Sequence, residues 1–461
     1  MNFGKAILRV LRVFGIIILI PVVLVLLVLL IGFITDLSVT PQWKQAQQES
    51  LEYFTRIKSL RYSSGVAFAA QDANAWDYYD RAVKQLDSLS AEEKQAITTL
   101  TRDGVPFDIK LAERLTQTYA PALALLDSGG VFTYCAIPYQ YEQGPMMPIP
   151  MYIPLQNLAK LGVIQGRVRI AQGKPRAAAD SYAKVLKMGA DIGGGGEVFI
   201  GRMVGIVIGQ AALKQIALDL DRFDLASVVL LEEALAKLEG NWPSPNMSLE
   251  PEFQVYFLPR VSGWNGSGLF ATFGIPRAGL AGKIQAQVVL SALSWRSFFS
   301  CRKGLLDGLR PNIAVVHGAR ILHGKNWAEA KAWLEKLDAE GKRASRRHDP
   351  ASFFFPNTFR MSKRFYEHLA AMRVLKASLA VRESRLEQPK NPPHPESVLA
   401  KDSSLFDLAN GQPLRVKMVP DGKTIRLYSV GLNLTDDAGE GNRIGERNPD
   451  QPKDDIWIEI H

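Results

Sequence analysis

The sequence predicts a mainly α-helical protein that carries one N-terminal transmembrane helix and ends in a small β module. Residues 14–34 contain no charged side chain, apolar residues recur every three or four positions through much of residues 74–385, and the apolar period becomes two near the C-terminus. We therefore expect the following parts: a cytoplasmic basic segment at 1–13, a transmembrane helix at 14–34, an extracytoplasmic helical domain at 35–387, a Pro-rich linker at 388–403, and a small β module with an acidic loop at 404–461.

The segment at residues 14–34 is almost entirely Leu, Ile and Val, interrupted by Pro21. A helix of this length covers about 31 Å, which matches the hydrocarbon core of a bilayer. The alternative is a cleaved signal peptide, but such peptides have apolar cores of about 7–15 residues followed by a small-residue cleavage site. Residues 35–41 offer no such site. We therefore expect an uncleaved anchor that contacts the lipid bilayer.

The orientation of this anchor follows from the charges around it. Lys5, Arg9 and Arg12 precede the segment, whereas acidic residues predominate in the stretch that follows it. The positive-inside rule then places the N-terminus in the cytoplasm. We expect a single-pass protein of the cytoplasmic (inner) membrane, with the bulk of the chain periplasmic or extracellular.

The helical domain begins with an amphipathic helix over residues 74–89, and the start of the next helix is marked by a capping box of Ser90 and Glu93. A further helix is expected at 111–126. Five prolines prevent a continuous helix through residues 138–154, so this segment is either a linker or a loop packed on the helices. We expect the packed loop, because its apolar side chains would otherwise be exposed.

The clearest part of the helical domain is a pair of helices at residues 155–170 and 177–188, joined by a Gly-Lys-Pro turn at 173–175. This pair resembles one tetratricopeptide-like hairpin, and because a repeat array needs at least three units we expect an irregular helical bundle. The four glycines at 193–196 are interpreted as a flexible turn, since no Gly-Lys-Ser/Thr follows to form a phosphate loop. Further helices are expected over residues 197–218, 225–238, 284–299, 327–337 and 361–385.

The net charge of +9 is spread along the chain, whereas a nucleic-acid interface needs a concentrated basic stripe. We therefore expect no nucleic-acid partner. The densest basic run, residues 342–348, is interpreted as a solvated helix end, with contact to anionic lipid or an envelope polymer as the alternative. The two cysteines, Cys135 and Cys301, are either a disulfide or two free thiols, and the lack of a Cys-x-x-Cys motif excludes the usual thiolate metal sites.

No catalytic constellation is visible. The six histidines form no His-Glu-x-x-His motif, and no Gly-x-Ser-x-Gly motif occurs. Glu92 and Glu93, like Glu232 and Glu233, are sequence neighbours that point in different directions on a helix, so both pairs are interpreted as solvated surface. We expect no catalytic residues and no enzyme, while a hydrolase whose site assembles from distant residues is the alternative.

The C-terminal module contains a predicted β-hairpin. Residues 414–419 alternate apolar and charged side chains, the Asp-Gly pair at 421–422 supplies a turn, and residues 424–430 form the second strand. A long polar loop at 431–455 then leads to a closing strand at 456–460.

This tail resembles a known pattern. Residues 407–414, the Leu-Tyr-Ser-Val-Gly run at 427–431 and the acidic loop that follows are similar to the C-terminal end of the major pseudopilins of type II secretion, over roughly the last 55 residues. The resemblance implies a calcium site, because clustered carboxylates suit this hard cation. By matching position the ligands would be the side chains of Asn433, Asp436, Asp437 and Asp455.

The tail also departs from the family pattern. Ala438 replaces an expected glycine, the loop is longer, and the N-terminus lacks the prepilin start, so we do not expect a processed pilin. A solvated acidic loop without calcium is the alternative interpretation. The whole layout, an anchor followed by an Ala-rich helical body and this tail, resembles a recurring class of bacterial single-pass membrane proteins to which no activity is assigned.

These observations lead to one functional hypothesis and two alternatives. We expect a membrane-anchored extracytoplasmic binding or scaffolding protein of the bacterial cell envelope, which acts on a protein partner in the envelope. The first alternative, suggested only by the tail, is a component associated with a secretion or pilus-like apparatus. The second is the envelope hydrolase named above.

Overall fold

The computed structural model describes residues 74–102, 104–139, 152–195, 199–242, 326–346, 358–446 and 453–461, together with isolated positions between 23 and 52. The prediction of a mainly helical protein is confirmed: 67% of the described residues are helical, and a four-stranded sheet lies near the C-terminus. Several expected features lie outside the described residues: the segment 1–13, most of the segment 14–34, the loop at 140–151, the helix at 284–299, and Cys301.

Four short helices open the body: α2 (Ala75–Gln85), α3 (Ala91–Leu100), α4 (Ile109–Thr118) and α5 (Ala120–Gly129). The predicted capping box at the start of α3 is confirmed, because the Ser90 hydroxyl accepts a hydrogen bond from the Glu93 N–H at 3.1 Å and the Glu93 carboxylate accepts one from the Ser90 N–H at 2.9 Å.

The single helix expected at 111–126 is wrong, because the chain divides it at Tyr119 into α4 and α5. Pro121 stands in the first turn of α5 and has no N–H to continue the hydrogen bonds of α4. Tyr119 is buried at the break, and its hydroxyl donates to the Glu93 carboxylate at 2.9 Å.

The predicted helix pair is confirmed as α6 (Tyr152–Ala171) and α7 (Pro175–Gly194), which pack against each other. The turn between them places Gly173 at a φ of 72°, which favours glycine. Two further helices follow, α8 (Phe199–Asp219) and α9 (Leu225–Asn241), joined by the short 3-10 helix η2 (Leu220–Arg222).

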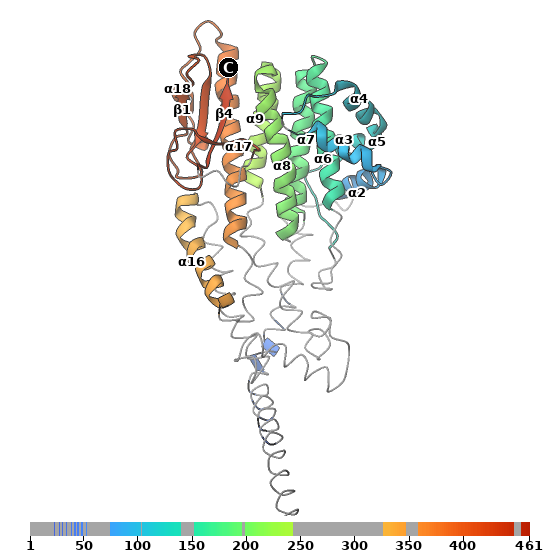
Figure 1. The fold of residues 1–461 in the computed structure, drawn as a ribbon, viewed down its shortest axis with the longest axis vertical. Helices are drawn as coiled ribbons and strands as arrows, with labels where there is room; N and C mark the ends of the chain where they lie inside the picture. The colour runs from blue at the N-terminus through green and yellow to red at the C-terminus, as the bar shows by residue number, and fades with distance from the viewer. Residues whose placement is uncertain are drawn as a thin grey trace, which may run out of the picture.

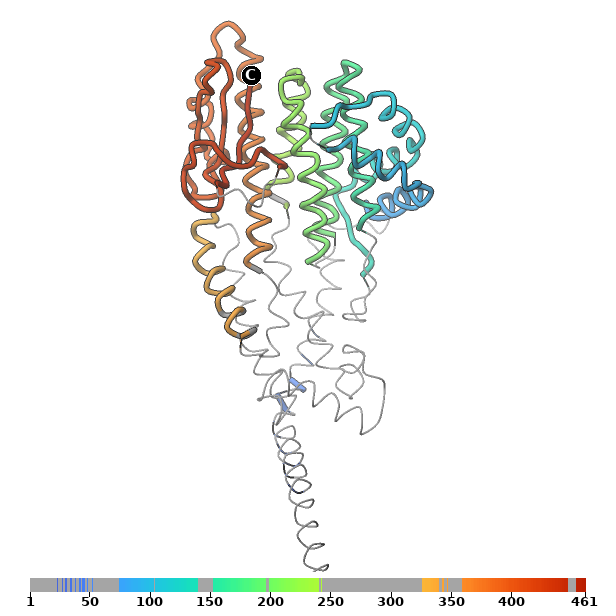
Figure 2. The backbone as a smooth tube through the Cα atoms, viewed as in Figure 1, coloured from blue at the N-terminus to red at the C-terminus, as the bar shows by residue number. Residues whose placement is uncertain are grey.

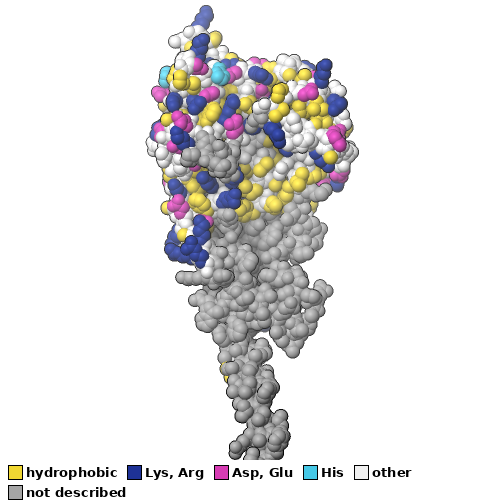
Figure 3. Space-filling view, viewed as in Figure 1, with side chains coloured by type: hydrophobic (Ala, Val, Ile, Leu, Met, Phe, Trp, Pro, Cys, Tyr) yellow, Lys and Arg dark blue, Asp and Glu magenta, His cyan; other side chains and the backbone are white. Residues whose placement is uncertain are grey.

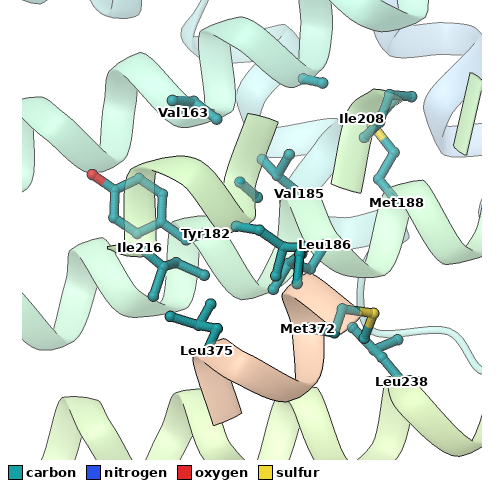
Figure 4. Close-up of a cluster of buried hydrophobic side chains, with 14 of the residues drawn as sticks. Val163, Tyr182, Val185, Leu186, Met188, Ile208, Ile216, Leu238, Met372 and Leu375 are labelled. Carbon is teal, nitrogen blue, oxygen red and sulfur yellow. The ribbon is translucent and has the colours of Figure 1, made fainter. Parts of the chain in front are cut away.

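The long helix α17 (Thr358–Glu387) completes a four-helix arrangement with α7, α8 and α9 (Figure 1). α7 packs against α8 and α9, α17 packs against the same two helices, and α6 lies outside α7 and α8. Buried apolar side chains form the core between them, and Figure 4 shows Leu186, Met372 and Leu375 meeting in this core.

The flexible turn expected at the glycines 193–196 is wrong in part, because the first two of these glycines are helical. Gly193 and Gly194 belong to α7, and the contact between α7 and α8 is built on glycine. A Cβ atom added to Gly189 would lie 2.8 Å from the carbonyl oxygen of Gly205 and 2.9 Å from the backbone nitrogen of Gly209. The two backbones therefore touch directly, which a pattern search along one helix does not reveal.

The segment 388–403 is packed rather than extended. It contains the helix α18 (Pro395–Leu399), whose Pro395 and Leu399 are buried and which packs on α17, and it leads into the 3-10 helix η5 (Ser403–Leu405). Proline is favourable in the first turn of a helix, where no hydrogen bond is lost, so a Pro-rich composition here starts a helix as well as breaking one.

The predicted hairpin is confirmed as β1 (Arg415–Met418) and β2 (Ile425–Ser429), and the closing strand is β4 (Asp455–Ile460). The sheet order is β1-β2-β4-β3, in which the unpredicted strand β3 (Gly441–Arg443) pairs parallel to β4. α17 packs on β2 and β4, and the buried side chains of the sheet share one hydrophobic core with the helices. The module is therefore docked on the body (Figure 2).

Among the described residues, one helical stretch, Phe199–Arg222, is long and apolar enough to cross a membrane. Because 67% of its apolar window is buried, it is a core helix of the body. Four positions inside the predicted anchor are described, and they are helical and exposed by 49–56%: Val23, Leu27, Leu30 and Ile34.

Candidate metal centre in the C-terminal acidic loop

The acidic loop runs from β2 to β4 and turns through left-handed backbone conformations. Gly431 and Gly439 have φ values of 64° and 72°, and Leu434 and Ala438 adopt 66° and 59° without being glycine. A Cβ atom at Gly431 would meet the backbone of Asp454, with the carbonyl carbon 2.6 Å away. The loop is thus folded tightly against the start of β4, and Ala438 occupies a conformation that glycine would adopt more easily.

The loop brings two of the four predicted ligands together. The Asn433 side-chain amide donates to the Asp437 carboxylate at 3.0 Å, and the Asn433 carbonyl oxygen accepts from the Thr435 N–H at 2.7 Å. The same Asp437 oxygen also accepts from the Asp454 N–H at 3.3 Å. These oxygens already have protein donors, so a cation would have to replace these hydrogen bonds.

Asp436 faces a different set of partners. Its carboxylate accepts from the Tyr428 hydroxyl at 3.1 Å and from the Ala438 N–H at 2.9 Å, and it lies 3.7 Å from the Arg415 guanidinium. Burial, followed by the hydrogen bond to Asp436, raises the pKa of Tyr428 to about 12. Asp436 therefore acts as a bridge between β1, β2 and the loop.

Asp455 is the most unusual of the four residues. Its side chain is fully buried, and one carboxylate oxygen, Oδ2, accepts from the Gly439 N–H at 2.8 Å. The other oxygen, Oδ1, has no hydrogen-bond partner. Burial, with the nearby charges of Asp437 and Asp436, raises the pKa of Asp455 to about 7. An unpartnered buried carboxylate oxygen is costly, so this atom needs a proton or a cation.

Asp454 is an acidic residue of the same loop and is not one of the four predicted ligands. Both of its carboxylate oxygens accept from the Asn433 N–H, at 3.2 and 3.1 Å, and one lies 3.9 Å from the Lys363 ammonium on α17. Burial raises its pKa. The two neighbouring residues differ in burial, because Asp455 begins β4 and is buried, whereas Asp454 precedes the strand and is partly exposed.

The four predicted ligands thus share one loop without converging on one point. Within the described ranges, no three His, Cys, Asp or Glu side chains form a group that could hold a metal ion. The donors are of the right kind for a hard cation, since all are oxygens, and among the described side chains of these four residues Asp455 Oδ1 is the buried oxygen without a hydrogen-bond partner. A calcium ion here would bind Asp455 Oδ1 and would compete with the hydrogen bonds of Asp437.

A buried carboxylate outside the loop holds the module in shape. Asp407 accepts hydrogen bonds from the Ala409 N–H at 2.8 Å, the Ser429 hydroxyl at 2.7 Å and the Val430 N–H at 2.9 Å. These bonds join the turn before β1 to the end of β2. Asp407 is therefore satisfied, and its role is structural.

Two further titratable groups lie in the helical body. Glu232, which the sequence analysis placed on solvated surface, is instead half-buried between α9 and α17, where burial and a hydrogen bond to Glu383 raise its pKa to about 8. His368 is fully buried beside Trp242, with ring centroids 4.3 Å apart, and burial lowers its pKa to about 3. Neither burial could be inferred from one helix alone, because the facing helix supplies it.

Comparisons with known proteins do not extend this description. No protein-family model matches the chain, and neither a curated protein nor a solved structure is significantly similar to it.

Proposed function

We propose that this chain is a membrane-anchored extracytoplasmic binding or scaffolding protein of the bacterial cell envelope, held in the bilayer by residues 14–34. The observation that carries the proposal is the helical positions Val23, Leu27, Leu30 and Ile34, which expose about half of their apolar surface. Lipid would remove this apolar surface from water.

Scaffolding is favoured over chemistry by how the polar groups of the module are used. The carboxylates of Asp407, Asp436 and Asp454 bind the backbone and side chains of the module itself. The half-buried Glu232 and the buried His368 belong to different helix contacts of the body. This distribution suits a rigid support that presents its surface to a partner.

A direct test is photo-crosslinking in intact membranes of the host bacterium. The crosslinking amino acid would replace Val131 or Ile153, whose side chains are 74% and 73% exposed and so cost little to change. A buried position, Leu158, serves as the control. We expect one recurrent envelope protein from both exposed positions and none from Leu158. Crosslinks to lipid alone, or to unrelated proteins at each position, would contradict a binding or scaffolding role.

Calcium binding by the acidic loop is a second candidate function, favoured by Asp455 Oδ1. A bound divalent ion stabilises the folded state by mass action, so the melting temperature of the chain in detergent should rise with calcium and fall with a chelator. The Asp455→Asn variant should lose this response. Identical melting of the native chain with calcium and with chelator would exclude the site.

A further inference from the structure

The helix α16 (Trp327–Arg346) is fixed at its N-terminal end to the C-terminal module. The Trp327 indole N–H donates to the carbonyl oxygen of Leu432 at 2.7 Å, and the backbone N–H groups of Trp327 and Ala328 donate to the carbonyls of Leu408 and Ala409, both at 2.9 Å. The Trp327 side chain is 1% exposed. This end of α16 is therefore held by three hydrogen bonds to backbone on either side of the hairpin.

The start of α16 is also capped and its inner face is buried. The Glu329 N–H donates to the Asn326 side-chain oxygen at 2.9 Å, and the Asn326 N–H donates to the Glu329 carboxylate at 3.2 Å, which forms a reciprocal cap. Ala330, Leu334 and Leu337 are buried, and α16 packs on α17. The helix is thus a rigid strut whose direction is set by the body.

The far end of this strut is basic. Lys342, Arg343 and Arg346 lie in its last two turns and are exposed. Lys342 pairs with Asp338 at 2.6 Å, whereas no ion pair of Arg343 or Arg346 is found among the side chains that the structure describes, which do not include that of Glu340. Figure 3 shows Lys and Arg side chains gathered at this end. Arg347 and His348, which continue the run in the sequence, lie outside the described residues.

Stabilisation of the helix C-terminus alone does not account for this cluster. One cation in the last turn satisfies the helix dipole, which contributes at most a modest amount at an exposed site. Two guanidinium groups three residues apart on one helix repel each other, and elsewhere on the face in Figure 3 basic and acidic side chains are interspersed. The cluster therefore favours an external partner with concentrated negative charge.

The placement of this end identifies the partner. Figures 1 and 2 show that α16 reaches further along the long axis than the neighbouring helix α17, toward the blue pieces that mark described positions before residue 53. We infer that the C-terminal end of α16, through Arg343 and Arg346, contacts the anionic phospholipid headgroups of the membrane in which residues 14–34 are anchored. The inference rests on the proposed anchoring. The strut would then hold the C-terminal module at a fixed height and orientation above the bilayer.

Hydrogen exchange of the full chain in lipid nanodiscs tests this contact. We compare discs of phosphatidylcholine alone with discs containing one-third phosphatidylglycerol, and we follow the peptide that covers the end of α16. Each basic side chain near an anionic surface strengthens binding roughly fivefold, so the Arg343→Gln/Arg346→Gln variant should weaken the contact by roughly 25-fold. We expect slower exchange in anionic discs, and we expect the double variant and 0.5 M salt to abolish that protection.

The matched control is the Lys401→Gln/Lys423→Gln variant, which removes the same charge from two exposed positions, one in the segment 388–403 and one in the C-terminal module. It should keep the protection. Equal exchange in the two kinds of disc, protection that survives in the Arg343→Gln/Arg346→Gln variant, or equal protection by inorganic phosphate in neutral discs would each overturn the inference. Release of the chain from all discs by alkaline carbonate would instead overturn the anchoring itself, so the two failures are distinguishable.

Discussion

Where α7 meets α8, Gly189 and Gly205 allow two helices to approach until backbone meets backbone, whereas in the C-terminal module the carboxylates of Asp407, Asp421 and Asp454 bind backbone N–H groups. The contact between α7 and α8 depends on close packing of the two backbones, whereas the module depends on hydrogen bonds to charged carboxylates. Close packing is insensitive to pH, but a carboxylate that accepts hydrogen bonds loses them when it is protonated. The contact between α7 and α8 and the C-terminal module should therefore respond differently to a change of pH.

The largest expected effect is in the bundle. The Gly205→Ala substitution would place a Cβ atom 2.8 Å from the Cα atom of Gly193, and the atoms it meets are backbone, which cannot rotate away. We expect the free energy of unfolding to fall by about 3 kcal/mol, the upper end of the usual cost of overpacking. Denaturant unfolding at two pH values measures this loss, which should not change with pH.

Val207 is the control for this substitution, because it lies on the same helix with its side chain 45% exposed. The Val207→Ala variant should lose less than about 1 kcal/mol. Equal losses in the two variants would show that the glycine contact is not what holds α7 against α8.

The next effect is in the module. The Asp407→Ala substitution leaves the Ser429 hydroxyl and the N–H groups of Ala409 and Val430 without an acceptor. We expect a loss of about 2 kcal/mol, since unsatisfied buried donors retain their desolvation cost. Asp402, an exposed cap of η5, is the matched carboxylate, and the Asp402→Ala variant should lose about 1 kcal/mol. A smaller loss for Asp407 than for Asp402 would contradict its structural role.

Asp455 provides the sharpest pH test of the comparison. Because its pKa is raised to about 7 in the folded chain, its contribution to stability is present below the unfolded pKa near 4 and is lost as pH rises through 7. The Asp455→Asn variant carries no charge, and its amide can donate toward Asp437. At pH 8 we expect the free energy of unfolding of this variant to exceed that of the native chain by about 1 kcal/mol, and its melting temperature to be higher. If the melting temperatures of the two chains changed in the same way between pH 4 and 8, Asp455 would not carry a buried charge.

The smallest expected effect concerns Ala438. At a φ of 59° alanine is strained, and glycine adopts this conformation freely. We expect the Ala438→Gly variant to be more stable by about 0.5 kcal/mol, as the gain in the folded loop is partly offset by the greater freedom of the unfolded chain. A loss of stability would show that the turn does not need the left-handed conformation.

Features that depend on neighbouring residues could be predicted from the sequence. The capping box of Ser90 and Glu93, the Gly173 turn and the hairpin around Asp421 all follow from local chemistry, and all are present. The break at Tyr119 was accessible in principle, because Pro121 signals it.

Features that depend on a distant partner could not be predicted. The strand β3 has three residues and no apolar alternation, and its existence depends on pairing with β4 across the loop. The glycines of α7 allow close packing only because glycines of α8 lie opposite them. For the acidic loop, the sequence indicated which residues gather but not that Asp455 is buried with an oxygen unpartnered, since that follows from the docking of the loop on the sheet.

The side of the membrane on which the body lies is the central claim, and cysteine labelling in intact spheroplasts tests it most directly. A membrane-impermeant maleimide would be applied to a Lys423→Cys variant, at the exposed hairpin tip, and to a Lys5→Cys variant, before the anchor, with the parent chain as background. We predict that the cysteine at 423 is labelled at once and the cysteine at 5 only after lysis. Labelling of position 5 in intact spheroplasts with protection of position 423, or recovery of either variant free of the membrane, would contradict the account.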